Sequence, residues 1–380
     1  MKKNILLIFG GKSCEHDISI ISALQVANNL DEYLYNIIPV YITKQGTMKY
    51  VKEFKKLNLS VGKLETNFDV GLIAGSNYIY KKKLSVFKKW QLIDCALVVM
   101  HGKNGEDGSL SALLNLSGIP YTCSDVAPSA ICMDKYFFKT ILKQLDCPVI
   151  DGLMITENEF FSKTQDVIKR VEDEIGFPAI IKPCNLGSSI GIKVCKSKQE
   201  LANCIEFGLK FDKKVIIEEF LPEITEINVA IFKHNDELIC SQLEQPIAKD
   251  DILSFNNKYI SNSKNGCEFL QKKMQPKLPK KVKDEIINVA KLVYEKLDFK
   301  GVVRFDFILN KNNNNVFLNE ANSIPGSLSN YLFEKNNLSF SDQLNMQIDE
   351  GIMEFNKQNS YISYFESSVL KGINFKKFNK

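Results

Sequence analysis

Residues 301–322 read GVVRFDFILNKNNNNVFLNEAN and contain two pairs of polar side chains, placed symmetrically about an asparagine-rich run. Arg304 and Asp306 form the first pair, and Glu320 and Asn322 form the second. On either side of the run, side chains alternate with the two-residue period of a β-strand, so each pair lies on one face of its strand. The pattern predicts an antiparallel hairpin that turns within the asparagine-rich run.

The predicted pairing of this hairpin brings two carboxylates together. A turn centred on residue 313 places Asp306 opposite Glu320 and Arg304 opposite Asn322, with all four side chains on one face. The Cβ atoms of opposed residues are only about 5 Å apart, so the carboxylates repel each other unless a cation is bound. Two acids and an amide are oxygen donors that Mg²⁺ takes together with phosphate oxygens. The hairpin therefore predicts a nucleotide-metal site; the alternative is an exposed polar hairpin with its register off by one residue.

Arginine is rare in this chain. Among its 49 lysines and arginines, only Arg170 and Arg304 are arginines. Because a guanidinium recognises a carboxylate or phosphate with two parallel hydrogen bonds, which an ammonium cannot do, Arg304 is a candidate functional residue. Arg170 lies in a charged helical run and is interpreted as a solvated helix residue.

Composition excludes several classes of protein. The chain has 380 residues, of which 44% are hydrophobic and 25% charged, and this length predicts two or three domains. The net charge of +4 and the scattered lysine runs do not form a nucleic-acid footprint. The ten cysteines lack metal-site spacing and the three histidines are not clustered, which argues against zinc and disulfide frameworks. With no signal peptide and no long apolar segment, we expect a cytoplasmic protein with no membrane partner.

The amino-terminal part predicts a parallel sheet. A buried-type strand at 4–9, an amphipathic helix at 17–30 and a second strand at 35–42 form a βαβ unit. The turn after the first strand contains Gly-Lys-Ser, but the earlier glycine of a phosphate-binding loop would fall at Leu6, and no G-x-G-x-x-G follows. A further strand at 95–100 delivers the segment 101–108 to the carboxyl end of the sheet, where ligands of α/β proteins bind.

A second region begins near residues 127–133, ahead of a helix that carries Lys135. A strand at 179–183 and a strand at 190–195 are joined by the turn 187–191, which is rich in glycine and serine and could fold over phosphates, with Lys182 supplying charge. A strand at 215–221 passes into a hinge that could bind adenine through its backbone; an edge strand with exposed acids is the alternative.

Read together, these segments resemble the D-alanine-D-alanine ligase family of ATP-grasp enzymes, from Phe9 to about Gly326. The matching segments are 9–19, 101–108 with 118–122, 133–135, 182–183 with 187–191, 304–306, 320–322 and 325–326. The resemblance implies a mixed α/β and α+β architecture: a Rossmann-like parallel-sheet domain at 1–127, a central ATP-grasp lobe at 128–225 and a carboxyl-terminal ATP-grasp lobe at 226–380.

The resemblance also implies an activity. ATP would convert the carboxylate of one D-alanine into an acyl phosphate, and the amine of a second D-alanine would attack it, giving D-alanyl-D-alanine for peptidoglycan precursor synthesis. The implied ATP-binding residues are Lys135, Lys182, Ser189, Glu218, Leu221 and Glu226. The implied ligands of two Mg²⁺ ions, with Mn²⁺ possible instead, are Asp306, Glu320 and Asn322.

By the same resemblance, Arg304 and a backbone N-H near Gly326 would face the oxyanion of the second step. Glu15 would pair with the ammonium group of the first D-alanine; the alternative is a helix-terminal acid favoured by the helix dipole. The segment 250–266 would close over the site, with Lys258 and Tyr259 matching the closing pair and Tyr259 contacting Ser188. A homodimer is also implied.

Two segments depart from the family pattern. Residues 254–257 replace an aromatic-acid-aromatic stretch, and residues 327–331 replace the threonine and serine that help to seat the second substrate. Two alternatives therefore stay open: a related ligase with another acceptor, such as D-serine, D-lactate or another amino acid, and a non-catalytic ATP-binding protein on the same scaffold.

Overall fold

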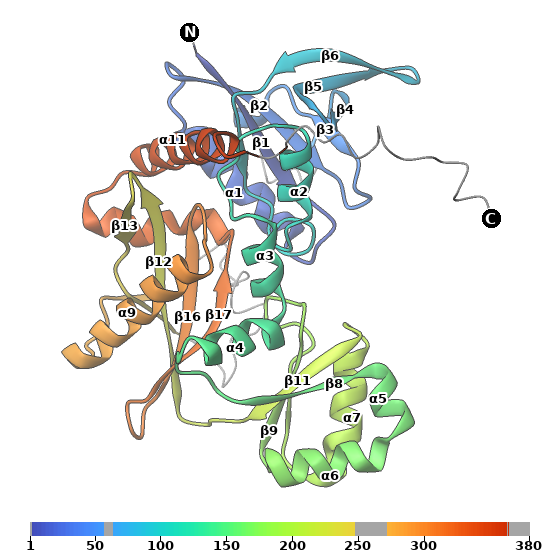
Figure 1. The fold of residues 1–380 in the computed structure, drawn as a ribbon, viewed down its shortest axis with the longest axis vertical. Coiled ribbons are helices and arrows are strands. Elements are labelled where there is room, and N and C mark those ends of the chain that lie inside the picture. The colour runs from blue at the N-terminus through green and yellow to red at the C-terminus, as the bar shows by residue number, and fades with distance from the viewer. Residues whose placement is uncertain (1, 57–63, 248–271, 363, 365–380) are drawn as a thin grey trace, which may run out of the picture.

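Three sheets follow one another along the chain, and they form three lobes stacked along the long axis of the molecule (Figure 1). The computed structural model describes residues 2–56, 64–247, 272–362 and 364. The first sheet has seven strands, the second four and the third six. No helix within these described ranges is long and apolar enough to cross a membrane.

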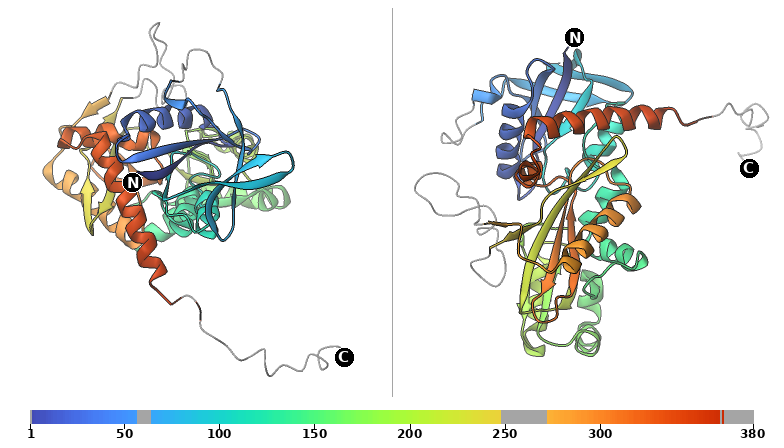
Figure 2. Two further views of the ribbon diagram at one scale, coloured as in Figure 1. Left: turned by 90° about the horizontal axis from the view of Figure 1, so that it is seen from above. Right: turned by 90° about the vertical axis from the view of Figure 1, so that its left-hand side faces the viewer.

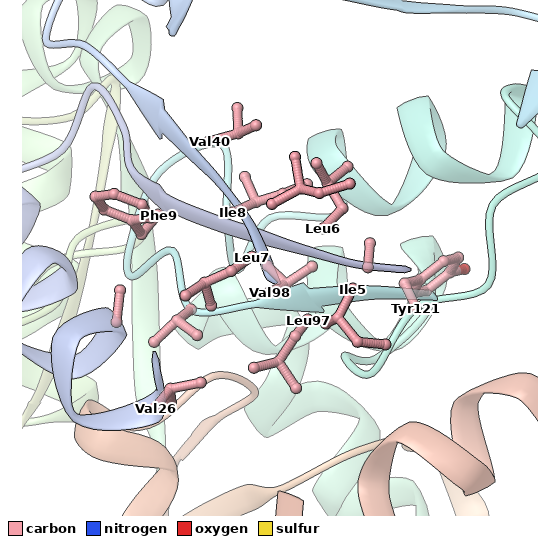
Figure 3. Close-up of a cluster of buried hydrophobic side chains, with 14 of the residues drawn as sticks. Ile5, Leu6, Leu7, Ile8, Phe9, Val26, Val40, Leu97, Val98 and Tyr121 are labelled. Atoms are coloured by element: carbon pink, nitrogen blue, oxygen red, sulfur yellow. The ribbon is translucent and has the colours of Figure 1, made fainter. Parts of the chain in front are cut away.

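The first sheet contains the predicted βαβ unit. Strand β1 (Lys3–Gly10) pairs in parallel with β2 (Tyr35–Ile42) and with β7 (Cys95–Val98), and α1 (His16–Asn29) connects β1 to β2. The apolar run 5–9 is almost completely buried because parallel strands are covered on both faces. Leu6 and Leu7 accordingly extend to opposite faces of β1 (Figure 3).

The same sheet continues through strands that were not predicted from the sequence, because residues 45–90 are rich in lysine and hard to assign. They add antiparallel strands to the parallel part, so the sheet is mixed and its strand order is β6-β5-β4-β3-β2-β1-β7. The added elements are β3 (Met48–Tyr50), η1 (Phe54–Lys56), β4 (Phe68–Ile73), β5 (Ser76–Lys83) and β6 (Val86–Leu92). Helices α2 (Ser109–Leu116) and α3 (Val126–Met133) complete this part of the chain.

The second sheet is small and antiparallel, with strand order β10-β9-β11-β8. Three helices pack on it; in α6, for example, the buried residues Val167, Ile168 and Val171 follow helical spacing. The strands are β8 (Gly152–Thr156), β9 (Ala179–Pro183), β10 (Lys193–Cys195) and β11 (Lys214–Glu219). The helices are α5 (Glu157–Ser162), α6 (Thr164–Glu174) and α7 (Lys198–Leu209).

The third sheet contains the predicted hairpin, formed by β16 (Val303–Asn310) and β17 (Val316–Asn322). Asp306 pairs with Glu320 and Arg304 with Asn322, so the predicted register is confirmed. Beyond Asp306 the register shifts, so that Phe307 pairs with Leu318 and Asn319 is the extra residue of a β-bulge. The other elements are β12 (Ile224–His234), β13 (Glu237–Cys240), β14 (Glu244–Pro246), β15 (Lys272–Met274) and α9 (Lys280–Lys296).

Two helices pack outside the lobe that their sequence position suggests. The last helix, α11 (Phe340–Asn359), buries Phe340, Leu344 and Ile348 in the core of the first lobe and lies across its lower edge (Figure 2). Helix α4 (Lys135–Gln144) buries Phe138 and Leu142 in the core of the third lobe. The domain boundaries at 127 and 225 stay a prediction. The chain between β17 and α11 forms η3 (Gly326–Ser329), α10 (Asn330–Phe333) and η4 (Glu334–Asn336).

Candidate active site

A cavity between the second and third sheets gathers residues from six separate segments. Polar and charged side chains from both sheets and from α4 line it, together with apolar residues of the hinge after β11. Among the residues predicted to bind ATP or metal, the cavity is lined by Lys135, Lys182, Ser189, Glu218, Leu221, Glu226, Asp306 and Glu320.

Glu218 lines this cavity and is fully buried, with 0% of its surface exposed. The Lys182 ammonium on the neighbouring strand donates a hydrogen bond of 2.8 Å to Glu218 Oε2, and the Lys139 ammonium lies 3.0 Å from Oε1. Burial alone would raise the pKa of Glu218, but Lys139 and Lys182 outweigh burial and bring this pKa to about 2. Glu218 is therefore ionised. Its neighbour Lys139 was not predicted from the sequence.

Lys135 begins α4 and faces the hairpin. Its ammonium donates to the Leu186 carbonyl oxygen at 2.6 Å and lies 4.0 Å from Glu320 Oε2. Asp134 caps the helix by accepting hydrogen bonds from the backbone N-H groups of Tyr136 and Phe137, and Lys214 forms an ion pair with the Asp134 carboxylate. The cap fixes the start of α4, so Lys135 is held at the cavity wall.

The hairpin presents its polar face to the same cavity. Arg304 donates to Asp306 through Nε at 2.6 Å and Nη2 at 2.7 Å, and Asn322 Nδ2 donates to Asp306 Oδ2 at 3.0 Å. In the described part of the chain, no three acidic, histidine or cysteine side chains are grouped to hold a metal. The donor set, two opposed carboxylates and an amide, fits a Mg²⁺ ion that takes its other ligands from phosphate or water. Each carboxylate oxygen has two lone pairs, so Asp306 can accept from Arg304 and still bind a cation.

A second cavity adjoins the first and contains Glu15. It is also lined by Glu106, Gly187, Glu320 and Asn322, so it shares the hairpin with the first cavity. Glu15 lies at the amino-terminal end of α1 and accepts a hydrogen bond from Ser188 Oγ. Ser188 and Ser189 both have φ of +57°, a left-handed backbone that is strained for residues other than glycine and is typical of functional turns. The turn 187–191 thus brings Ser188 to Glu15, and Ser189 to the first cavity.

Glu106 and His101 belong to the segment that the sequence analysis placed at the carboxyl end of β7. Glu106 accepts the backbone N-H groups of Gly102 at 2.7 Å and Ile324 at 3.0 Å. Burial and the negative charge of Glu15 raise the pKa of Glu106 to about 8. His101 lies 2.7 Å from the Ile324 carbonyl oxygen through Nδ1, and burial lowers its pKa. The segment was identified from the sequence, but these two residues were not singled out because their burial depends on contacts with residues near 324.

The remaining predicted residues lie elsewhere. Gly326 begins η3, in which Ser327, Leu328 and Ser329 have φ of 50°, 49° and 49°. This turn is attached to α1 because the backbone N-H of Ser327 donates to Ser22 Oγ at 2.9 Å. Lys258, Tyr259 and the segment 250–266 lie outside the described residues.

The chain combines an α/β domain with two antiparallel lobes, and the cavity between these lobes is lined by lysines and opposed carboxylates. This arrangement defines an ATP-grasp enzyme. Two family models match this chain: the D-ala D-ala ligase N-terminus over residues 4–124 and the D-ala D-ala ligase C-terminus over residues 141–345. A D-alanine-D-alanine ligase from Caldicellulosiruptor bescii is 35% identical over 376 residues, covering 96% of this chain and 98% of the relative.

Solved structures share the fold of this chain. The D-alanine-D-alanine ligase from Coxiella burnetii has a TM-score of 0.79 at 24% identity, covering 94% of this chain and 96% of its own, which shows the shared fold. VanG D-Ala:D-Ser ligase from Enterococcus faecalis has a TM-score of 0.77 at 26% identity, covering 92% of this chain and all of its own. The chain belongs to the D-alanine-D-alanine ligase family and is an ATP-dependent ligase.

Proposed function

We infer that the two cavities carry out the family's reaction, the ATP-dependent joining of two D-alanine molecules to D-alanyl-D-alanine for peptidoglycan synthesis. One carboxylate is activated as an acyl phosphate, and the amine of the second molecule displaces the phosphate. The observation that carries this proposal is the position of Asp306 and Glu320, opposed on one hairpin and lining one cavity with Lys135 and Lys182.

The first cavity is proposed to hold ATP. Lys135 and Lys182 supply positive charge for the phosphates, and Ser189 lies on the turn that would cover them. The Lys139 ammonium lies 3.0 Å from Glu218 Oε1. Because a carboxylate oxygen has two lone pairs, Oε1 can accept an N-H of the adenine amino group as well. Leu221 lines the base region, and Glu226 on β12 is the proposed ribose ligand.

The hairpin is proposed to hold two Mg²⁺ ions through Asp306, Glu320 and Asn322. Bound there, the ions would neutralise phosphate charge. Arg304 is proposed to face the oxyanion that forms when the second amine attacks, together with a backbone N-H near Gly326. Its hydrogen bonds to Asp306 fix the plane of the guanidinium, and donors held in position before the reaction need no reorganisation during it.

Glu15 is proposed to bind the ammonium group of the first D-alanine. It lines the second cavity beside Glu320, so an amino acid bound there has its carboxylate near the proposed phosphate site. Ser188 holds the Glu15 carboxylate by its hydrogen bond. The closing role of Lys258 and Tyr259 stays a prediction, as do cytoplasmic location and a homodimer; sedimentation equilibrium would measure the last.

The experiment is phosphate release with Mg²⁺-ATP and D-alanine alone, followed by D-alanine with D-serine or D-lactate, with products identified by mass. Dipeptide from D-alanine alone is the expected result. Phosphate release only with another acceptor would assign the chain to the related ligases, the alternative that the unusual sequence of residues 327–331 suggests. Tight ATP binding without release in any mixture would contradict the proposal and favour a non-catalytic ATP-binding protein.

A further inference from the structure

Lys139 is a buried lysine that contacts Glu218 of the ATP cavity, and the proposed reaction does not use it. It lies on α4 one helical turn after Lys135, and only 3% of its surface is exposed. Its ammonium donates to the Ile150 carbonyl oxygen at 3.2 Å and lies 3.0 Å from Glu218 Oε1. Glu218 therefore has a buried ammonium group beside each of its two oxygens.

The charges in this cluster do not balance. The Glu218-Lys182 pair alone would be neutral. Burying a second ammonium group costs free energy, so we expect its charge to have a function. Burial, together with the positive charges of Lys182 and Lys135, lowers the pKa of Lys139, and the nearby Glu218 carboxylate offsets only part of this lowering. Lys182 has a second contact, since its Nζ lies 3.4 Å from Asn319 Oδ1 at the bulge of the hairpin. With Lys139 present, the cluster of one carboxylate and two ammonium groups has a net positive charge, and Lys182 is the member next to the hairpin.

We propose that Lys139 is a positioning residue for nucleotide recognition: it neutralises and orients the Glu218 carboxylate, so that Glu218 accepts the amino group of the base while Lys182 keeps its positive charge for the phosphates. This inference rests on the proposed binding of ATP in this cavity. Without Lys139, Glu218 would be neutralised by Lys182 alone. The attraction of Lys182 for phosphate would fall, and the carboxylate could turn toward Lys182 and away from the base.

The experiment compares Lys139→Met with the parent, using ATP and inosine triphosphate as alternative nucleotides. Inosine triphosphate has a carbonyl oxygen where ATP has the amino group, so an ionised Glu218 acceptor favours ATP. We expect Lys139→Met to raise the KM for ATP at least tenfold with a smaller change in kcat. We also expect the ratio of kcat/KM for ATP to that for inosine triphosphate to fall at least tenfold, and Lys139→Arg to restore part of this ratio.

Lys143→Met is the matched control, because Lys143 lies one turn further along α4 and pairs with Asp151 at 2.7 Å on the surface. It should leave both nucleotides unaffected. A merely structural role for Lys139 would lower the melting temperature and affect both nucleotides equally. An unchanged ratio in folded Lys139→Met would overturn the inference, and Lys139→Gln gives the same test if the methionine variant does not fold.

The failure of this inference can be distinguished from failure of the proposed function. If the parent forms dipeptide from ATP and D-alanine, but the nucleotide ratio does not respond to Lys139, only the role of Lys139 is wrong. If the parent neither binds nor hydrolyses ATP, the proposed function fails, and the inference fails with it.

Discussion

Asp306 of β16 lies directly opposite Glu320 of β17, yet the two carboxylates have different neighbours. Asp306 accepts both hydrogen bonds of the Arg304 fork, whereas Glu320 Oε2 lies 4.0 Å from the Lys135 ammonium. One carboxylate is thus held by the sheet that carries it, and the other faces a lysine from α4. A cation bound at the proposed metal site would offset the repulsion between these opposed acids.

Glu320→Gln tests the proposed metal site. The amide keeps the shape of the side chain but removes its charge, so we expect turnover to fall below detection and binding of Mg²⁺-ATP to weaken by about tenfold or more. Calorimetry with and without Mg²⁺ measures the binding, and circular dichroism should show an unchanged fold. Glu237→Gln, on the exposed end of β13 in the same sheet, is the control. Near-normal turnover of Glu320→Gln would refute the metal assignment.

Arg304→Lys tests the proposed oxyanion contact. Lysine keeps the positive charge but loses the planar fork, so both the bidentate pair with Asp306 and the fixed donor direction are lost. We expect kcat to fall by about 10², as for loss of one oxyanion donor, with a smaller change in KM. Arg170→Lys is the matched control, since Arg170 pairs with Glu159 on α5, in the second lobe. Equal kcat values for the two variants would remove Arg304 from the reaction.

The raised pKa of Glu106 predicts that the stability of the protein depends on pH. Its pKa rises from 4.5 to about 8 on folding, because of burial and of the charge on Glu15. Below pH 4.5 the carboxyl group is protonated in both states. As the pH rises toward 8, the unfolded chain releases the proton and the folded chain keeps it, so the free energy of unfolding decreases.

Glu106→Gln should remove this loss. We expect the free energy of unfolding of the variant, relative to the parent, to increase between pH 4.5 and 8 by on the order of 4 kcal/mol, since one pKa unit corresponds to about 1.4 kcal/mol. Urea unfolding at several pH values measures the difference. Glu174→Gln, an exposed residue at the end of α6, controls for loss of a carboxylate. A difference that does not vary with pH would show that Glu106 is ionised in the folded protein.

Gly301, which precedes β16 of the third lobe, packs closely against the backbone of Thr122 in the first lobe. Its φ is +65°, and a Cβ at this position would lie 1.9 Å from the Thr122 carbonyl oxygen. Gly301→Ala should therefore destabilise the protein by about 3 kcal/mol or more, because the backbone of one lobe must move away from the other. Gly118 has the same φ of +65° with nothing within 4 Å of its Cβ position, so Gly118→Ala isolates the backbone strain of about 1–2 kcal/mol. Equal melting temperatures for the two variants would contradict the close contact.

The local sequence pattern was sufficient to predict much of the fold. Strands β2 and β9 begin and end where the sequence predicts, because a run of apolar residues bounded by turn residues specifies a buried strand. The hairpin register was also predictable at the polar pairs, since alternation fixes which side chains share a face. The bulge at Asn319 was not predicted, because it depends on how the hairpin turns and packs.

The sequence by itself determined the fold class, the family resemblance and eight of the residues that line the first cavity, since each follows from short segments whose spacing and order can be read directly. Only the tertiary structure decided that Lys139 meets Glu218, that Glu106 is buried beside Glu15, and that α11 packs in the core of the first lobe. These facts depend on contacts between residues far apart in the chain. Burial then sets the charge state of a side chain, and neither contact nor burial is written in the local pattern.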